Sequence, residues 1–440
     1  MLCLEFPPVN TTGNYRSAGF AMAFSKSGHD VEVITTTVES GLETFNKGVD
    51  DTLLAGLESI KVHRYPIKSI SKFFSQGIGN AIRIWWNSTD SIDKRWYYGK
   101  NKRRMQEVVK RFKPDVLYVS LPPFSIARVA IDLKSQHSLP LITDMRDAWS
   151  LWATSPYSTR YHYKKVKRLE RALFNASDAI LGVTQQLVDD FKTQHPSIIE
   201  NKFHVVFNGY DKNNVQIKTE EKHPVVPPTF TIGYVGSFYY DPGSDASMAS
   251  AWHKRSGLKK FWFSPRKEFW EYRSPHFFLK AMALHNQKFP DHKIRFEFVG
   301  KIPYWLEPML NNLGVTSDFK AHGFKSKEEV LRIQHTWDGI LATSEKIEDR
   351  PHFCLPSKIF DAIESGKRII AFVTQGAQMD FLKQYKQAVF FSPDDVEENS
   401  VYLHDLTNSE NSFTVTPLQS EFFREEQSKK LITILEQEVK

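Results

Sequence analysis

The stretch "DVLYVSLPPFSIARVAIDLKSQHSLPLITDM", residues 115–145, contains the pattern that decides the fold. Two short apolar runs, "DVLYVSL" and "LPLITDM", are typical of buried strands. Between them, "SIARVAIDLKSQ" carries apolar residues at helical spacing. Strand, helix and strand in this order are the repeating unit of a parallel sheet, and the alternation runs through residues 1–212. We therefore predict an α/β domain with a doubly wound parallel sheet.

A second alternation begins at Phe230. Its strand candidates are "FTIGYVGSF", "IRFEFVG", "DGILATS", "RIIAF" and "AVFFS". The polar and then proline-rich stretch before them indicates a linker over residues 213–229. The sequence thus predicts an N-terminal domain over 1–212, a second domain over 230–420, and an amphipathic C-terminal helix over 421–440 that could pack on either domain. Two such domains place a ligand in the cleft between them, at the carboxyl ends of the strands.

The composition is that of a soluble globular protein, with 41% hydrophobic and 25% charged residues. No apolar run reaches the roughly 18 residues of a membrane span, and the start lacks the pattern of a signal peptide. Cys3 and Cys354 are too few for a disulfide framework or a thiolate metal site. So few cysteines fit a reducing cytoplasm best. The histidines show no zinc spacing and no Asp-x-Asp pair occurs, so we expect no metal and no other cofactor.

The net charge of +7 is concentrated in two segments that are also rich in aromatic residues. Residues 61–113 hold 14 Lys and Arg against 3 acids, and residues 251–275 hold 7 against 2. Such segments suit an anionic membrane surface or single-stranded nucleic acid, and no nucleic-acid-binding motif is present. We expect peripheral binding to the inner face of a membrane, in which Trp85, Trp86, Trp96 and Tyr97 insert and Arg103 and Arg104 meet the headgroups. The alternative is a solvated basic face over buried tryptophans.

Several loops at predicted strand ends carry groups that suit an anionic ligand. In "EFPPVNTTGNYR", Gly13 and Asn14 form a tight loop before a helix whose first turn holds Arg16, which together make an anion cradle. In "GYVGSFYY", Gly236 lets a ligand approach the backbone, and Ser237 follows it. Neither loop has the glycine spacing of a Walker or dinucleotide-binding motif.

Two further strand-end segments carry charged side chains. "TDMRDAW" places Asp144, Arg146 and Asp147 after a buried strand, either as an internal ion pair and a helix cap or as groups that orient sugar hydroxyls and accept a proton. "CLPSKIFDAIESGKRIIAF", residues 354–372, places Ser357, Lys358 and Asp361 at the start of an apolar helix. These three residues either cap the helix or hold the phosphate and sugar of a nucleotide.

Six motifs occur in an order that resembles a known family. They are "FPPVNTTGNYR" with "SKSGHDVEVIT", then "TDMRDAW", "FNGYD", "IGYVGSF" and "LPSKIFDAIESGKRIIAF". In this order the chain is similar to the retaining glycosyltransferases of family 4, of the branch that builds bacterial capsule and O-antigen sugars. The resemblance covers nearly the whole chain apart from residues 251–272, which look like an insertion. It implies the GT-B fold, in which two Rossmann-like domains face a central cleft.

The resemblance also implies roles for single residues. Asp361 takes the position of the carboxylate that binds the ribose of the nucleotide, and Ser357 and Lys358 lie where the family binds the donor diphosphate. Gly13 and Asn14 match the loop that faces the sugar phosphate, and Gly236 matches the glycine turn on the donor side. Arg273 resembles the basic residue that neutralises the leaving diphosphate. In the family that phosphate is thought to take the acceptor proton, so no nucleophile and no metal are required.

The sequence departs from the family at two places. Phe353 stands where many members have the first glutamate of a spaced pair, and Pro122-Pro123 replace a histidine. Asp144, Arg146 and Asp147 are therefore our candidates for the sugar-contacting and catalytic groups, together with Lys358.

The expected partners are a nucleoside-diphosphate sugar and a glycan or lipid-linked acceptor. The alternatives are a nucleotide-sugar epimerase on the same fold and a non-catalytic adaptor that binds a membrane or another enzyme.

Overall fold

The computed structural model describes residues 1–11, 13–69, 79, 82, 92–152, 157–211, 229–238, 242, 252–255, 257–408 and 413–439. The chain forms two compact units. Unit 1 contains residues 1–211, 252–265 and 420–440, and unit 2 contains residues 212–251 and 266–419. The predicted linker, 213–229, lies outside the described residues except for Thr229.

Unit 1 is built on a parallel sheet. Its strands are β1 (Glu32–Thr36), β2 (Lys61–Tyr65), β3 (Leu117–Leu121), β4 (Leu141–Met145), β5 (Ala179–Gly182) and β6 (Phe203–Val205). The backbone of Leu2 bridges Ile34 of β1 and Val119 of β3, so the first residues of the chain lie between these two strands. The sheet order is therefore β2-β1-Leu2-β3-β4-β5-β6. The order reverses between Leu2 and β3, which is where open α/β sheets bind ligands.

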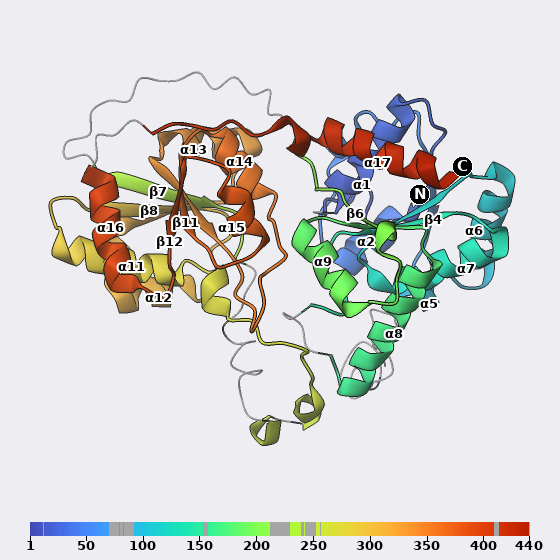
Figure 1. Ribbon diagram of the computed structural model, residues 1–440, viewed down its shortest axis with the longest axis horizontal. Helices are drawn as coiled ribbons and strands as arrows, with labels where there is room; N and C mark the ends of the chain where they lie inside the picture. The colour runs from blue at the N-terminus through green and yellow to red at the C-terminus, as the bar shows by residue number, and fades with distance from the viewer. Residues whose placement is uncertain are drawn as a thin grey trace. The chain divides into compact units, whose positions relative to one another are not determined.

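Unit 1 also contains the helices that connect its strands and one helix from the C-terminal end of the chain. They are α1 (Asn14–Lys26), α2 (Val38–Phe45), α5 (Ile92–Trp96), α6 (Gly99–Phe112), α7 (Ala127–His137), α8 (Arg160–Ala176), α9 (Gln185–Gln194) and α17 (Arg424–Val439). The C-terminal helix α17 packs against α1, as Figure 1 shows, because Leu431, Ile434 and Leu435 share a buried cluster with Phe20 and Phe24. The last residues of the chain therefore belong to the core of unit 1.

Unit 2 is a second parallel sheet with strand order β12-β11-β10-β7-β8-β9. Its strands are β7 (Phe230–Val235), β8 (Ile294–Val299), β9 (Phe319–Gly323), β10 (Gly339–Thr343), β11 (Arg368–Phe372) and β12 (Ala388–Phe391). Its helices are α11 (His276–Lys288), α12 (Leu306–Leu313), α13 (Lys327–Thr336), α14 (Lys358–Glu364), α15 (Ala377–Leu382) and α16 (Val396–Asn408). Figure 1 shows α11 and α12 on one face of this sheet and α13 and α14 on the other.

This placement of the helices follows from the handedness of parallel crossovers. The connections from β7 through β8 to β9 run in one direction along the sheet, and those from β9 through β10 to β12 run in the other. Because each crossover is right-handed, a reversal of direction moves the helix to the opposite face. The reversal lies between β7 and β10, so the loops after these two strands surround the expected ligand position of unit 2.

The doubly wound α/β class predicted from the sequence is confirmed in both units. Two strands escaped prediction, β2 and β9, and both lie at the edge of their sheet. Their residues are mostly half-buried or exposed, whereas all five residues of the central strand β4 are buried. An edge strand contacts solvent and needs no continuous apolar run, so the pattern that reveals central strands does not reveal it.

Candidate functional site

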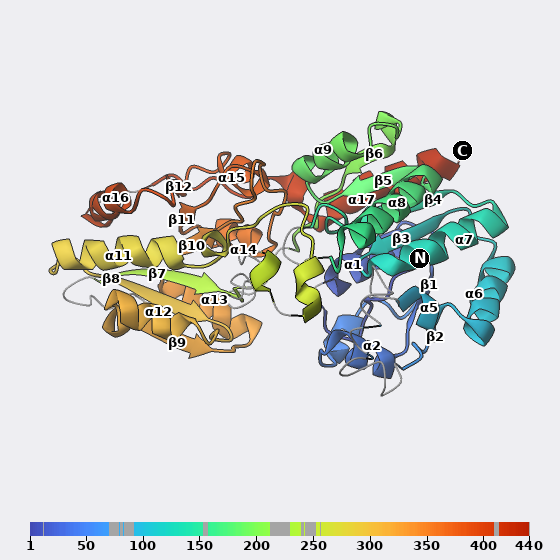
Figure 2. The same ribbon diagram turned by 90° about the horizontal axis from the view of Figure 1, so that it is seen from below.

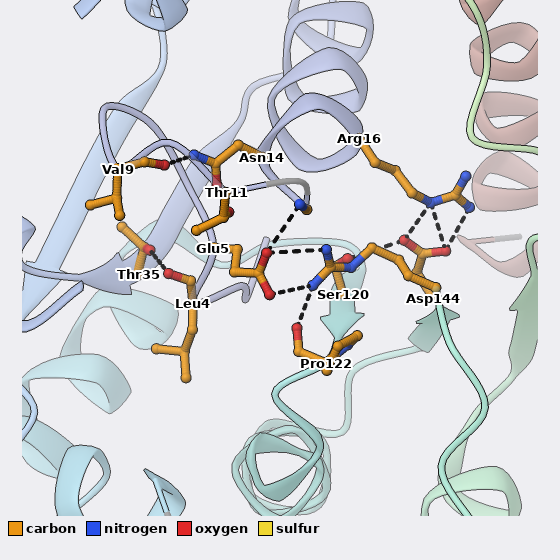
Figure 3. A network of polar contacts seen from close by, with 12 residues as sticks. Leu4, Glu5, Val9, Thr11, Asn14, Arg16, Thr35, Ser120, Pro122 and Asp144 are labelled. Carbon is orange, nitrogen blue, oxygen red and sulfur yellow. Dashed lines mark hydrogen bonds and ion pairs between the residues drawn. The ribbon is translucent and has the colours of Figure 1, made fainter. Parts of the chain in front are cut away.

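In unit 1, the helix α1 and the strand β4 are joined by a buried ion pair (Figure 3). The Arg16 guanidinium donates from Nε and Nη2 to the carboxylate of Asp144, at 3.0 Å to Oδ2 and 2.7 Å to Oδ1 respectively. The same carboxylate accepts from Tyr118 Oη at 2.6 Å and from Ser120 Oγ at 3.1 Å. Arg16 and Asp144 are 3% and 0% exposed.

The Arg16–Asp144 pair is charged and fully paired. Burial by itself would raise the pKa of Asp144, but the Arg16 guanidinium and the Tyr118 hydroxyl outweigh it and hold this pKa below the ordinary value. A buried carboxylate with four donor groups around it has no position left for a substrate hydroxyl. Asp144 therefore anchors Arg16, and the sequence-based hypothesis that it contacts a sugar does not agree with its complete burial.

The loop before α1 also uses its polar side chains internally. Thr11 Oγ1 donates to Asn14 Oδ1 at 2.9 Å, and Asn14 Nδ2 donates to the carbonyl of Val9. Asn14 is completely buried, so its amide shapes the loop and is not accessible to a donor sugar. The other anion-binding group of the loop, the N–H of Gly13, donates to Glu5 Oε2 at 3.1 Å.

The predicted anion cradle of unit 1 thus holds an internal carboxylate, that of Glu5. Arg146 completes this arrangement with Nη2 3.2 Å from Glu5 Oε1, and the same nitrogen donates to the Pro122 carbonyl. A Cβ atom on Gly13 would lie 1.6 Å from Arg146 Nη1, so only glycine leaves room for this guanidinium. Glu5 and Arg146 remain 13% and 10% exposed, at the point where the strand order of unit 1 reverses.

Arg146 and Asp147 are the accessible members of the "TDMRDAW" segment. Burial alone would lower the pKa of Arg146, but Glu5 together with Asp147 raises it above its ordinary value. Asp147 is half-buried. The sequence had left open whether Arg146 pairs with one of its neighbouring aspartates, and in the structure its partner is Glu5, 141 residues away.

In unit 2, a glycine turn and a lysine meet at the carboxyl end of β7. Gly236 has a φ of +125°, which a residue with a side chain rarely adopts, and its N–H donates to the Val299 carbonyl at 2.9 Å. A Cβ atom on Gly236 would lie 3.8 Å from Lys358 Nζ, so the lysine amino group lies over this turn. Ser237, the next residue, is exposed.

Lys358 lies in an environment that weakens its charge. Its Nζ lies 3.9 Å from the centroid of the Tyr234 ring and donates to the Tyr234 hydroxyl. Among the described residues it forms no ion pair with a carboxylate. Burial lowers the pKa of Lys358 to about 7, to which the nearby Arg273 guanidinium adds, while Cys354 opposes the shift. An anion that binds beside such a lysine favours its protonated form, and no acid among the described residues competes with that anion.

Arg273, in contrast, is held between two carboxylates. Its Nη1 lies 3.0 Å from Glu268 Oε1 and its Nη2 lies 3.0 Å from Glu345 Oε1. Burial would lower the pKa of Arg273, but the two glutamates raise it well above its ordinary value, so the side chain is always a cation. The Arg273 side chain is 16% exposed, and its guanidinium is paired with Glu345, which follows β10 closely.

The start of α14 answers the question that the sequence left open about Ser357. Ser357 occupies the N-cap position with helical φ and ψ, and its side chain makes no capping hydrogen bond. It is exposed, and Asp361, in the first turn, is half-buried. The side chain of Ser357 therefore does not cap α14. Gly236 and Lys358 lie together, and Arg273 contributes to the lowered pKa of Lys358. The two carboxylates around Arg273 could not be recognised in the sequence.

Sequence reasoning missed two acidic residues at these sites, Glu5 and Glu345. Each is the first charged residue after a strand that borders the reversal of strand order, namely the Leu2 segment and β10. Asp144 was chosen because it is a charged residue at a strand end. The same criterion would have found Glu5 and Glu345, had the strand order been known. Phe353, which stands in place of a family glutamate, is buried. Among the described residues, no group of three or more His, Cys, Asp or Glu lies close enough to hold a metal ion.

Comparisons with known proteins agree with this architecture. The model of a family described as Glycosyltransferase Family 4 matches residues 18–214, which confirms the resemblance for this part of the chain. No curated protein matches the chain at a significant level. No helix in the described part of the chain is long and apolar enough to cross a membrane.

Solved structures that resemble the chain cover it almost completely. HepE of Anabaena in complex with UDP and glucose has a TM-score of 0.52 at 13% identity, covering 99% of this chain and 97% of its own. A glycosyltransferase from Rickettsia africae has a TM-score of 0.56 at 14% identity, with coverages of 100% and 98%. The lipopolysaccharide outer core galactosyltransferase WaaB has a TM-score of 0.57 at 12% identity, covering 99% of this chain and 98% of its own. At these identities the likeness shows a shared fold, GT-B, which confirms the fold predicted from the sequence.

Proposed function

We propose that this chain, whose fold is GT-B and whose residues 18–214 match Glycosyltransferase Family 4, is a glycosyltransferase. It would move a sugar from a nucleoside-diphosphate sugar to a glycan or lipid-linked acceptor, with retention of configuration. The proposal rests on the surroundings of Lys358. This lysine is desolvated, has no acidic partner among the described residues and lies over the turn at Gly236. HepE, which shares the fold, was crystallised with UDP, so UDP is the first nucleotide to test.

The proposed chemistry in unit 2 follows from its two cations. Cleavage of the bond between the sugar and the diphosphate leaves negative charge on the phosphate, and groups fixed in advance stabilise that charge at little cost. Lys358 provides charge that no described carboxylate neutralises, and Arg273, held by Glu268 and Glu345, provides a cation of fixed position. An anion bound beside Lys358 raises its pKa and keeps it protonated. With these cations present, the proposed reaction needs no metal ion.

Unit 1 would then receive the acceptor. Its accessible polar groups at the reversal of strand order include Glu5, Arg146 and Asp147. Glu5 and Asp147 are suited to accept hydrogen bonds from sugar hydroxyls, and Arg146 fixes the orientation of Glu5. The acceptor hydroxyl would lose its proton to the departing phosphate on the same face of the sugar, which gives retention. NMR of the anomeric proton of donor and product tests this step directly.

Ligand binding tests the proposal at its first step. A thermal-shift screen of the full chain with nucleoside diphosphates and nucleotide sugars should find at least one that stabilises it. A ligand at a hundred times its Kd adds about 2.7 kcal/mol to the stability of the protein that binds it. A nucleotide sugar that stabilises the chain is then incubated with it and with candidate acceptors. If no nucleotide stabilises the chain, the adaptor hypothesis is preferred.

Asp361→Asn is expected to weaken nucleotide binding about tenfold while the fold is retained, because an ionised carboxylate makes stronger hydrogen bonds to ribose hydroxyls than an amide does. Isothermal titration with the nucleotide found in the screen measures this. Glu364→Gln, three residues further along α14, removes the same charge and serves as the control. Equal affinities of the parent and the Asp361 variant would show that Asp361 does not bind the ribose.

Nucleotide-sugar affinity is expected to fall as the pH rises above neutral. The pKa of Lys358 is about 7 in the free protein, so above that pH the side chain must take up a proton before it can meet the diphosphate as a cation. The loss stays well below tenfold per pH unit and levels off at the affinity of the protein with a neutral lysine, as calorimetry between about pH 6.5 and pH 8.5 would show. Lys358→Arg keeps its charge throughout this range and should remove the dependence. A parent whose affinity does not change with pH would contradict the low pKa.

A further inference from the structure

Unit 1 contains two basic helices, α6 and α8. They differ in whether acidic residues pair with their Lys and Arg side chains. On α6, Lys102 Nζ lies 3.1 Å from Asp132 Oδ2, and Arg103 Nε lies 3.5 Å from Glu107 Oε1. Arg111, also on α6, lies 2.9 Å from Glu32 Oε2. Three of the six cations of α6 therefore have an acidic partner, so the surface that the sequence favoured for membrane binding is partly neutralised.

The aromatic residues beside α6 do not suit insertion either. Trp96 is completely buried and its Nε1 donates to the Tyr65 carbonyl at 3.0 Å. The Tyr97 hydroxyl donates to Asp132 Oδ2 at 2.6 Å. Trp85 and Trp86 lie outside the described residues. For Trp96 the expectation of membrane insertion was wrong, because this ring belongs to the core of unit 1.

Helix α8 has the opposite character. It contains six Lys and Arg and one acid, Glu170, which is completely buried and accepts from the Ser150 N–H at 2.7 Å. None of the six cations forms an ion pair with a described residue. Four of them are exposed and follow one another at intervals of four, four and three residues, namely Arg160, Lys164, Arg168 and Arg171. Side chains at this spacing lie on one face of a helix.

Residues 252–265 extend this face. They interrupt the sequence of unit 2 but fold onto unit 1, beside α8 (Figures 1 and 2). The backbones of Tyr157 and Phe263 exchange two hydrogen bonds of 2.8 and 2.9 Å, and the Phe263 ring lies 5.1 Å from that of Tyr163. The segment adds three exposed lysines, Lys254, Lys259 and Lys260.

Two large aromatic side chains are exposed, one on α8 and one on the segment 252–265 that packs against it. Tyr161, beside Arg160 on α8, is 66% exposed, and Phe261, two residues before the contact at Phe263, is 57% exposed. Cations without acidic partners attract any polyanion, but an exposed phenylalanine ring gains free energy only by leaving water. Cations together with exposed rings are the composition of a surface that lies in the headgroup region of a bilayer.

We propose that Arg160, Lys164, Arg168, Arg171, Tyr161 and Phe261 form a docking surface for an anionic phospholipid bilayer, the α8 surface, which residues 252–265 enlarge. The lysines and arginines would lie at the headgroups, and the rings of Phe261 and Tyr161 would enter the interface. The α8 surface does not depend on the proposed transferase chemistry, because its residues are separate from the groups assigned to substrates.

Flotation of the full chain with vesicles tests the α8 surface without any need for turnover. At low salt, the protein should float with vesicles of phosphatidylcholine and phosphatidylglycerol and not with phosphatidylcholine alone. The variant Lys164→Glu/Arg168→Glu should lower the partition at least roughly tenfold, because each cation near an anionic surface contributes a factor of about five. Phe261→Ser should weaken the binding that remains at higher salt, where charge is screened.

The matched control makes the same change of charge on the other helix. Arg103→Glu/Arg104→Glu alters α6 and should leave most of the vesicle binding intact, and thermal unfolding checks that each variant is folded. A larger loss for the α6 variant than for the α8 variant would overturn the proposal. So would equal flotation with neutral and anionic vesicles, or retention on heparin by a protein that binds no vesicles, which would indicate a soluble polyanion as the partner.

Discussion

Replacing Lys358 by alanine is expected to lower kcat of sugar transfer by about 10²–10³-fold, with a much smaller change in nucleotide-sugar affinity. The reason is that the negative charge on the diphosphate grows as the bond to the sugar breaks, so the lysine stabilises the transition state more than the bound substrate. Lys358 is the cation of this site whose charge no described carboxylate neutralises, whereas Arg273 lies between Glu268 and Glu345.

Steady-state kinetics with the nucleotide sugar, combined with direct titration of binding, separates the two effects. Tyr234→Phe is the matched control, because it removes the hydroxyl that Lys358 contacts but keeps the ring and the charge. A variant without Lys358 that keeps the parental kcat and only raises KM would show that the lysine contributes to binding alone.

Replacing Asp144 by alanine is expected to destabilise unit 1 by about 3–5 kcal/mol, because it leaves the Arg16 guanidinium buried without its partner. The Tyr118 and Ser120 hydroxyls lose their acceptor in the same variant. Since the pKa of Asp144 is held below its ordinary value, its contribution is complete above the ordinary range of a carboxyl group and is lost as the pH falls through the lower value.

Hydrogen exchange of the amides of β3 and β4 measures this loss locally, which suits a protein of two units. The double variant Arg16→Met/Asp144→Leu removes both charges and should regain most of the stability, because replacing a buried pair by apolar residues costs far less than breaking it. If Asp144→Ala kept full protection of β4 and lost only activity, Asp144 would contact a substrate as the sequence suggested.

Much of the fold could be predicted because burial leaves a mark on the local sequence. Central strands such as β3 and β4 are apolar along most of their length, since both faces of a parallel sheet are covered by helices. The edge strands β2 and β9 carry no such mark. The turn at Gly236 could also be predicted from the sequence, since a glycine directly after a strand can adopt the positive φ that it has in the structure.

The partners of the charged residues could not be predicted in the same way. The sequence placed Arg16, Asp144 and Arg146 at strand ends, but not the pairing of Arg16 with Asp144 or of Arg146 with Glu5, which are 128 and 141 residues apart in the chain. Strand order decides these pairs, because it brings the ends of the Leu2 segment, β3 and β4 side by side. The same holds for Arg273, which precedes α11, because its partner Glu345 lies beyond β10, much further along the chain.

By itself, the sequence determined two parallel-sheet domains, the positions of their strand ends and the types of residue that gather there. Only the tertiary structure decided which of these residues are free to act. It buried Asp144 and Asn14, left Lys358 without an acidic partner among the described residues, and gave three cations of α6 acidic partners that the cations of α8 do not have among the described residues. The physical reason is that burial and charge pairing depend on neighbours far away in the chain, whereas the apolar periodicity that forms a strand or a helix is local.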